Sequence, residues 1–305
     1  MKSNKFARCI AGAAAFFSTA CLVQESSAQD SADWFKSIFS LTGEYLAEET
    51  YIGDADVERG KHVVRDFSES DTVLRLVLTP RTDIGVLRIG AEWELFSFGM
   101  PKRALLPNTL QSASLIVGLD MSFSDSILVR LEAQPGLYGT NHLGFDEVNM
   151  PFIAGGTYIY NPNLQFILGV SVDIERKYPV IPAAGVRWKV FRQWLLNAVL
   201  PDPRIEFEAA RNLTLYLGAN VKETNFRVDD QFGNAQGNPA LNHAVLTYSE
   251  VRTGVGADWK ISSNLILSAE AGYQPYRNFD FYRTNIRFHE NGSAPYGMIS
   301  LHGAF

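Results

Sequence analysis

The sequence predicts an all-β protein, a transmembrane antiparallel up-and-down β-barrel of about 12–14 strands that follows a cleaved N-terminal signal peptide. Three observations predict this class: long segments alternate strictly between apolar and polar residues, short turns alternate with long polar loops, and the chain begins with an export signal. We therefore expect a signal peptide at 1–28, an N-terminal periplasmic segment at 29–42 and an outer-membrane β-barrel at 43–305.

The amino terminus has the three parts of a secretory signal. Three basic residues within the first eight precede the apolar run CIAGAAAFFSTACLV, and Ser26–Ala28 supply small residues for cleavage. Both cysteines, Cys9 and Cys21, lie inside this segment, and a lipoprotein acylated at Cys21 is the alternative interpretation. The mature barrel is expected to have no cysteine, which removes disulfides, thiolate nucleophiles and cysteine-rich metal sites.

The bulk composition narrows the class further. A net charge of −6 over 305 residues gives no basic surface for a nucleic-acid partner. Beyond the amino terminus we find no run of about 18 apolar residues, so a transmembrane helix is not expected. The mean hydropathy of −0.05 is compatible with a barrel, because alternating strands keep the average near neutral.

Four segments share one pattern, in which a short polar turn is followed by strict alternation. Three of them begin with Asn-Leu, at Asn163, Asn212 and Asn264, and a looser copy begins at Asp125. Each follows another alternating run, which predicts hairpins with tight turns on one side of the sheet. The connections at the far ends are longer and polar, as in outer-membrane barrels.

The strand count depends on two segments. Pro201 and Pro203 cannot donate to a β-ladder, so we interpret PDP as a turn between two strands. With a first strand from Gly43 the total is about fourteen, and without these segments it is about twelve.

A soluble or surface-attached β-sandwich that binds a ligand and has no channel activity is the alternative, because its strands also alternate. Runs of about ten residues favour membrane strands over sandwich strands of about five or six. Aromatic residues also gather toward strand ends, as at a lipid–water boundary. These aromatic pairs are Phe96 and Phe98, Tyr158 and Tyr160, Phe191 and Trp194, and Tyr273 and Tyr276.

The carboxyl end, GMISLHGAF, places Ile299, Leu301 and Phe305 on one face. This pattern resembles the β-signal that the barrel-assembly machinery reads in bacterial outer-membrane proteins, although Gly303 departs from it. The resemblance implies that this machinery and outer-membrane lipid are partners. A closed barrel also requires its first and last strands to pair, since every backbone polar group in a membrane must be satisfied internally.

The most distinctive stretch is Tyr178–Ala219, which contains Pro-Ala-Ala-Gly, Trp-Leu-Leu-Asn and Leu-Pro-Asp-Pro-Arg. It resembles the DUF6268 family of predicted outer-membrane barrels. The resemblance covers most of the mature chain. It implies a barrel in the cell outer membrane of a Gram-negative-type bacterium, and it implies no activity.

Alternation directs nine cationic and ten anionic side chains to the predicted lumen, so the lumen is expected to be nearly neutral. Balanced charges suit either cross-strand ion pairs that stiffen the wall or a narrow channel with a transverse field. The predicted lumen-lining residues are Arg88, Glu92, Arg130, Glu132, Glu175, Arg187, Arg252, Asp258 and Glu270.

The sequence gives no support for catalysis. Ser300 and His302 share a face, but it is the lumen face, and no phospholipase motif surrounds them. The segment VDDQFGN lacks the spaced carboxylates of a calcium loop, and no phosphate-binding motif is present. We therefore expect no enzyme activity, no catalytic residues, no cofactor and no metal. The expected function is a narrow porin-like channel for small polar solutes or a structural barrel.

Overall fold

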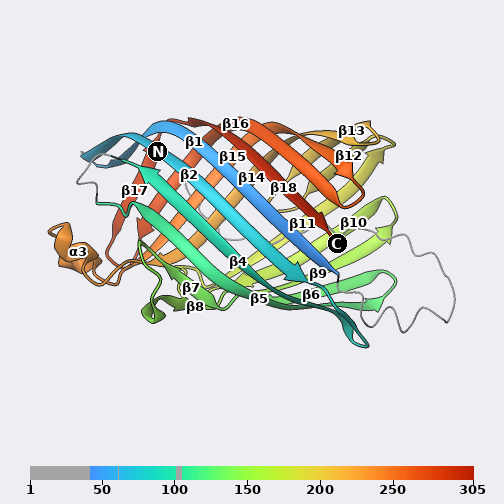
Figure 1. Ribbon diagram of the computed structural model, residues 1–305, viewed down its shortest axis with the longest axis horizontal. Helices are drawn as coiled ribbons and strands as arrows, with labels where there is room; N and C mark the ends of the chain where they lie inside the picture. The colour runs from blue at the N-terminus through green and yellow to red at the C-terminus, as the bar shows by residue number, and fades with distance from the viewer. Residues whose placement is uncertain (1–41, 61, 101–104) are drawn as a thin grey trace.

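The computed structural model describes residues 42–60, 62–100 and 105–305, and these residues form one closed antiparallel sheet (Figure 1). The signal peptide and all but Thr42 of the N-terminal segment predicted from the sequence lie outside the described residues. The sheet confirms the predicted all-β barrel and has fourteen strands. Ten of these strands are uninterrupted: β1 (Gly43–Arg59), β4 (Gly85–Gly99), β5 (Thr109–Ser124), β10 (Leu164–Val172), β11 (Val180–Phe191), β12 (Trp194–Ala198), β13 (Arg204–Ala210), β14 (Leu213–Arg227), β15 (Val245–Ser262) and β16 (Leu265–Phe281).

The other four strands are each made of two segments. They are β2 (His62–Leu78) with β3 (Arg81–Thr82), β6 (Ile127–Ala133) with β7 (Gly136–Gly139), β8 (Val148–Asn149) with β9 (Phe152–Asn161), and β17 (Ile286–Asn291) with β18 (Ala294–Ala304). The helical segments are short: η2 (Phe145–Glu147), α3 (Phe232–Ala235) and η3 (Pro239–Leu241). None of the helices in the described ranges has the length and apolarity needed to cross a membrane.

The barrel closes where its first strand meets its last. β1 pairs with β18 from Glu44 opposite Ala304 to Ile52 opposite Tyr296. Gly43 and Phe305 exchange backbone hydrogen bonds of 3.0 and 2.9 Å at the end of this seam. One continuous ring, rather than two stacked sheets, rules out the β-sandwich alternative.

The tight turns lie at one end of the barrel, which we call the short-turn end, and α3 lies at the other, the long-loop end (Figure 1). A side-chain oxygen fixes several short turns by accepting a backbone N–H two residues later. The Asn161 side chain accepts from Asn163 at 2.8 Å, and the Ser262 hydroxyl accepts from Asn264 at 3.2 Å. This local chemistry explains why strands begin after the turns at Asn163 and Asn264.

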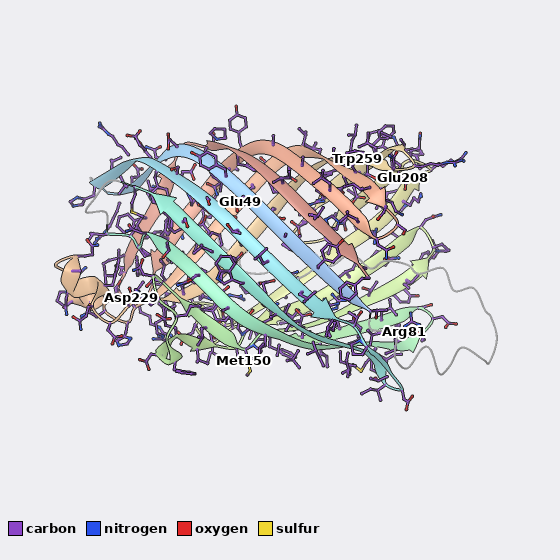
Figure 2. All side chains as sticks on the ribbon, in the orientation of Figure 1. Glu49, Arg81, Met150, Glu208, Asp229 and Trp259 are labelled. Atoms are coloured by element: carbon purple, nitrogen blue, oxygen red, sulfur yellow. The ribbon has the colours of Figure 1, made fainter. Side chains whose placement is uncertain are left out.

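The outward face of the wall is apolar and carries aromatic residues near the short-turn end. Trp188, Phe191, Trp194 and Trp259 are 45–68% exposed there. Figure 2 shows Trp259 at this end. The prediction that Phe96 and Phe98 belong to such a belt was wrong, because β4 directs both rings into the barrel, where they are buried.

The barrel wall is shorter along the barrel axis between β11 and β14, because β12 and β13 have only five and seven residues. Pro201 and Pro203 occur in their connection, where a proline costs no ladder hydrogen bond. On the long-loop side of this hairpin, the outward face of β14 changes from exposed to covered. Leu217 is 57% exposed, whereas Asn225 is 2% exposed and donates to Asp173, which follows β10, at 2.6 Å. β14 also pairs with β7 at Gly139, so the sheet folds inward at the long-loop end.

Candidate channel interior

The interior of the long-loop end is filled by aromatic side chains, which we call the aromatic seal: Phe67, Phe96, Phe98, Tyr248 and Phe279. Their ring centroids lie 4.9–6.5 Å apart, and the side chains are at most 7% exposed. Aromatic pairs at such separations add to the stability that burial provides.

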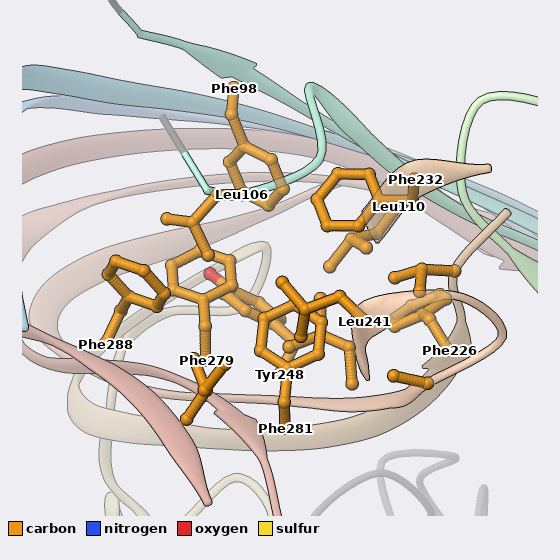
Figure 3. Packing of buried hydrophobic residues seen from close by; sticks show 14 of the residues in the cluster. Phe98, Leu106, Leu110, Phe226, Phe232, Leu241, Tyr248, Phe279, Phe281 and Phe288 are labelled. Carbon is orange, nitrogen blue, oxygen red and sulfur yellow. The ribbon is translucent and has the colours of Figure 1, made fainter. Parts of the chain in front are cut away.

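The loop between β14 and β15 closes over the aromatic seal. Phe232 of α3 and Leu241 of η3 are buried against it, and Leu106 packs from the segment before β5 (Figure 3). Side chains from the wall and from this loop therefore form one hydrophobic core inside the barrel. A solute that entered from the long-loop end would have to displace that core.

Directly beneath the seal lies a group of acidic and basic side chains that we call the central cluster. Lys222 of β14 donates to Asp71 of β2 at 2.7 Å and to Glu94 of β4 at 2.8 Å. β14 is a neighbour of neither strand, so these contacts pass through the interior. The Lys222 nitrogen also lies 4.9 Å from the centre of the Phe96 ring, the arrangement of a cation–π contact.

Two arginines complete the central cluster. Arg277 donates to Glu69 at 2.9 Å and lies 3.1 Å from Glu290, and the side chains of Arg277 and Glu69 are 0% exposed. Arg252 donates to Thr50 at 2.7 Å and forms ion pairs with Glu250 at 3.4 Å and Glu48 at 3.9 Å. The Tyr248 hydroxyl joins Glu69 to Glu250, at 2.7 and 3.1 Å.

Toward the short-turn end the interior becomes a series of separate ion pairs. Arg130 contacts both carboxylate oxygens of Asp120, at 2.6 and 2.7 Å. Arg88 lies between Glu132 at 3.1 Å and Glu44 at 3.2 Å, and Arg75 pairs with Glu92. These contacts join strands on the inward face of the wall.

Several of these pairs are partly exposed, although the side chain of Arg88 is only 2% exposed. The side chains of Arg130 and Asp120 are 24% and 31% exposed, and those of Arg204 and Asp258 are 27% and 25% exposed. In the central cluster Asp71 is 1% exposed. Water therefore reaches some of these pairs from the short-turn end and is excluded beneath the aromatic seal.

A glycine makes room for one interior ring in this open section. Tyr216 lies flat over Gly256, where an added Cβ would come within 2.3 Å of the ring carbon Cζ. The Arg204 guanidinium covers the ring from 4.3 Å. The Tyr216 ring therefore lies against the wall instead of crossing the interior.

Most of the residues predicted to line the lumen lie on inward faces. Arg88, Glu92, Arg130, Glu132, Arg252 and Asp258 take part in the ion pairs above, and Glu270 accepts a hydrogen bond from the Tyr296 hydroxyl. Arg187 lies opposite Asn197 in the register of β11 and β12.

Glu175 requires a correction, because it lies in the turn after β10 and not on a strand. The Asp173 carboxylate accepts the Glu175 backbone N–H at 2.9 Å, which ends the strand in a turn. The Glu175 carboxylate then pairs with Arg227 and Arg283 at the long-loop end. It therefore holds that turn against β14 and lines no part of the open section.

The prediction missed most of the central cluster: Glu48, Glu69, Asp71, Glu250, Arg277 and Glu290. Two of these residues, Glu69 and Asp71, lie in β2, which begins at His62. The sequence does contain a pattern that predicts them, since Phe67, Glu69 and Asp71 continue the inward parity of Arg75. The register shift at Val251–Thr253 adds a residue to β16 and reverses its alternation, so Arg277 lies inward although its parity differs from that of Glu270.

The three residues predicted as an assembly signal lie on the outward face of the seam. Ile299, Leu301 and Phe305 are 54%, 37% and 50% exposed. Ser300 and His302 alternate with them, and Ser300 is buried at 5% exposure. No three His, Asp or Glu side chains of the described residues are placed to hold a metal ion.

A cavity of about 340 Å³ lies at the long-loop end, outside the aromatic seal, and Asp229 and Glu147 are among the residues that line it. Asp229 accepts hydrogen bonds from Thr140 and Asn141, both at 2.9 Å, which hold the β14–β15 loop to the loop after β7. Figure 2 shows Asp229 beside α3. Burial raises the pKa of Glu147, although the backbone N–H of Gly144 donates to its carboxylate.

Residues 39–298 match the family described as domain of unknown function, DUF6268. No curated protein matches the chain. Among solved structures, the COG4313 outer membrane channel from Pseudomonas putida F1 aligns over 87% of this chain and 95% of its own, with 8% identity and a TM-score of 0.50. The toluene transporter TbuX of Ralstonia pickettii aligns over 87% and 90%, with 10% identity and a TM-score of 0.38. OprB of Pseudomonas putida aligns over 90% and 96%, with 7% identity and a TM-score of 0.36. The likeness to the COG4313 channel supports the outer-membrane barrel fold alone.

Proposed function

The chain belongs to the DUF6268 family, and from that premise we propose that it forms a gated outer-membrane channel for small polar solutes. One observation carries the proposal. The interior is charged and partly open to water at the short-turn end, whereas packed side chains, the β14–β15 loop and the inward fold at β7 and β14 block it at the other end. A barrier of this kind can move, because it adds no strand to the wall.

The membrane assignment rests on the outward face. Leu74, Leu115, Leu168, Leu217 and Ile299 are each 47–67% exposed on separate strands. Apolar surface of this extent around a closed ring fits contact with lipid. In this orientation the short-turn end faces the periplasm, and the barrel-assembly machinery and outer-membrane lipid are its partners. Recovery of the protein in the soluble periplasm would contradict the assignment.

A structural barrel is the second candidate, and the contacts of Lys222 with Asp71 and Glu94 favour it. They tie strands together across the interior and would stiffen a wall protein as well as they would gate a channel. The two functions differ in one measurable property, which is whether ions cross the barrel once the seal is loosened.

A planar-bilayer experiment separates the two candidates. Arg227 and Val245 pair directly, so residues 228–244 can be replaced by an Asn-Gly turn without altering the strands. We expect brief openings from the native protein and steady stepwise conductance from the loop-replaced variant. Phe145→Ala, at a 91% exposed position outside the seal, serves as the matched control and should behave as the native protein. Silence of both the native protein and the loop-replaced variant would favour the structural role.

A further inference from the structure

We propose that the central cluster is a recognition site for cations, and that the solutes it admits carry a primary ammonium group. This inference rests on the channel function proposed above, and it names the substrate class of that channel. Three features of the cluster support it: its charge balance, its unpartnered acceptor oxygens and the way it already holds Lys222.

Acidic side chains outnumber basic ones in the central cluster. Its direct contacts join three cationic side chains, those of Lys222, Arg252 and Arg277, to six carboxylates. The carboxylates are Glu48, Glu69, Asp71, Glu94, Glu250 and Glu290. The near-neutral count predicted for the whole lumen therefore conceals a local excess of acid at the point where water is excluded. A ring of excess carboxylates selects for cations.

Acceptor oxygens in the same place lack donors. Asp71 Oδ1 and Gln274 Oε1 are buried and accept no hydrogen bond, in residues that are 1% and 0% exposed, and Glu250 Oε1 faces only the Arg252 Nε at 3.4 Å. A buried acceptor without a donor costs free energy, and the cost is larger when the oxygen is charged. A solute that brings both positive charge and N–H donors would satisfy these oxygens.

Lys222 shows which solute group the walls accept. Its ammonium lies between two carboxylates, Asp71 at 2.7 Å and Glu94 at 2.8 Å, and faces the Phe96 ring. Two carboxylates and an aromatic face are the groups that bind an organic ammonium most favourably. Lys222 is thus a tethered occupant of the site, and a free primary ammonium would use the same contacts when it passes.

The first test measures ion selectivity in the loop-replaced channel under a KCl gradient. We expect a reversal potential that shows cation preference, and we expect methylammonium to block the potassium current. Glu250→Gln should shift the reversal potential toward zero, because it removes one buried charge and keeps the side-chain shape. Glu290→Gln provides a second variant if Glu250→Gln fails to assemble.

Two adjacent residues of β1 give a matched pair for this test. Glu48 lies in the central cluster, whereas Glu49 faces outward, where Ser70 and Thr72 donate to it at 3.1 and 2.6 Å (Figure 2). Glu48→Gln should reduce cation preference, and Glu49→Gln should leave it unchanged. Equal shifts from both variants would show that general surface charge is responsible, which would overturn the assignment of the site.

A second measurement does not depend on conduction. Calorimetric titration of methylammonium into the Lys222→Met variant in lipid nanodiscs should give saturable binding that an added Glu250→Gln abolishes and an added Glu49→Gln retains. A silent bilayer with this binding intact would contradict the channel and support the site. Conductance without cation preference, together with no methylammonium binding, would overturn the site and leave the channel in place.

Discussion

The Lys222 ammonium lies 2.7 Å from the Asp71 carboxylate, although β14 and β2 share no hydrogen bond in the ring of strands. The contact therefore crosses the inside of the barrel. It places a fixed cation directly beneath the aromatic seal, within 4.9 Å of the Phe96 ring centre. Lys222 thus connects the polar interior to the hydrophobic core that blocks it.

Removal of this cation should destabilise the barrel. Lys222→Met leaves Asp71 and Glu94 without their shared partner, and loss of one member of a buried ion pair costs about 3–5 kcal/mol. Urea unfolding in lipid vesicles measures the change. Lys260→Met, at an exposed position on β15, should cost little, and equal stability of the two variants would contradict the prediction.

The same variant should be rescued by a small ammonium ion. If the site binds primary ammonium groups, methylammonium will raise the unfolding midpoint of Lys222→Met more than that of the native protein, because it fills the vacated position. Tetramethylammonium has no N–H donor and serves as the control. Identical responses to the two ions would show that hydrogen bonds to Asp71 and Glu94 are not involved.

The aromatic seal should contribute both to stability and to closure. Phe279 is 0% exposed, and its ring centroid lies 5.3 Å from that of Phe98 and 5.0 Å from that of Tyr248. Phe279→Ala should lower the free energy of unfolding by about 3–5 kcal/mol through the cavity it leaves. It should also lengthen channel openings in a planar bilayer. If the variant is destabilised but opens no more than the native protein, the aromatic seal stabilises the barrel without controlling channel opening.

The β14–β15 loop should loosen when its attachment is removed. Asp229→Ala deletes the acceptor for Thr140 and Asn141, which join this loop to the one after β7. We expect faster amide hydrogen exchange across 228–244 with little change in global unfolding, since the strands are untouched. Unchanged exchange in this segment would mean that burial of Phe232 and Leu241 holds the loop by itself.

The outward face should reject charge. Leu217→Arg places a cation where lipid is expected, at a cost of about 2–4 kcal/mol near the membrane midplane. Thr214→Arg, on the inward face of the same strand opposite Asp258, should be tolerated. Folding yield into vesicles compares the two variants. Equal yields would count against lipid contact at Leu217.

Local patterns in the chain were sufficient for much of the wall. Alternation, short turns at Asn163, Asn212 and Asn264 and the break at Pro201 and Pro203 depend on neighbouring residues, so the sequence predicted the barrel class, the strand count and the inward face. Glu175 was misplaced because one side-chain bond from Asp173 ended β10 earlier than the alternation indicated.

The sequence by itself determined that this chain closes into a ring of alternating strands with charged residues inside, because period-two alternation and turn chemistry are properties of consecutive residues. Only the tertiary structure decided which charges meet and where water stops. Lys222 and Asp71 are 151 positions apart in the chain and lie together only because a closed ring brings distant strands face to face. The aromatic seal has the same origin, since Phe96 and Phe98 share the inward parity of Glu92 but meet Phe67, Tyr248 and Phe279 only in the closed ring.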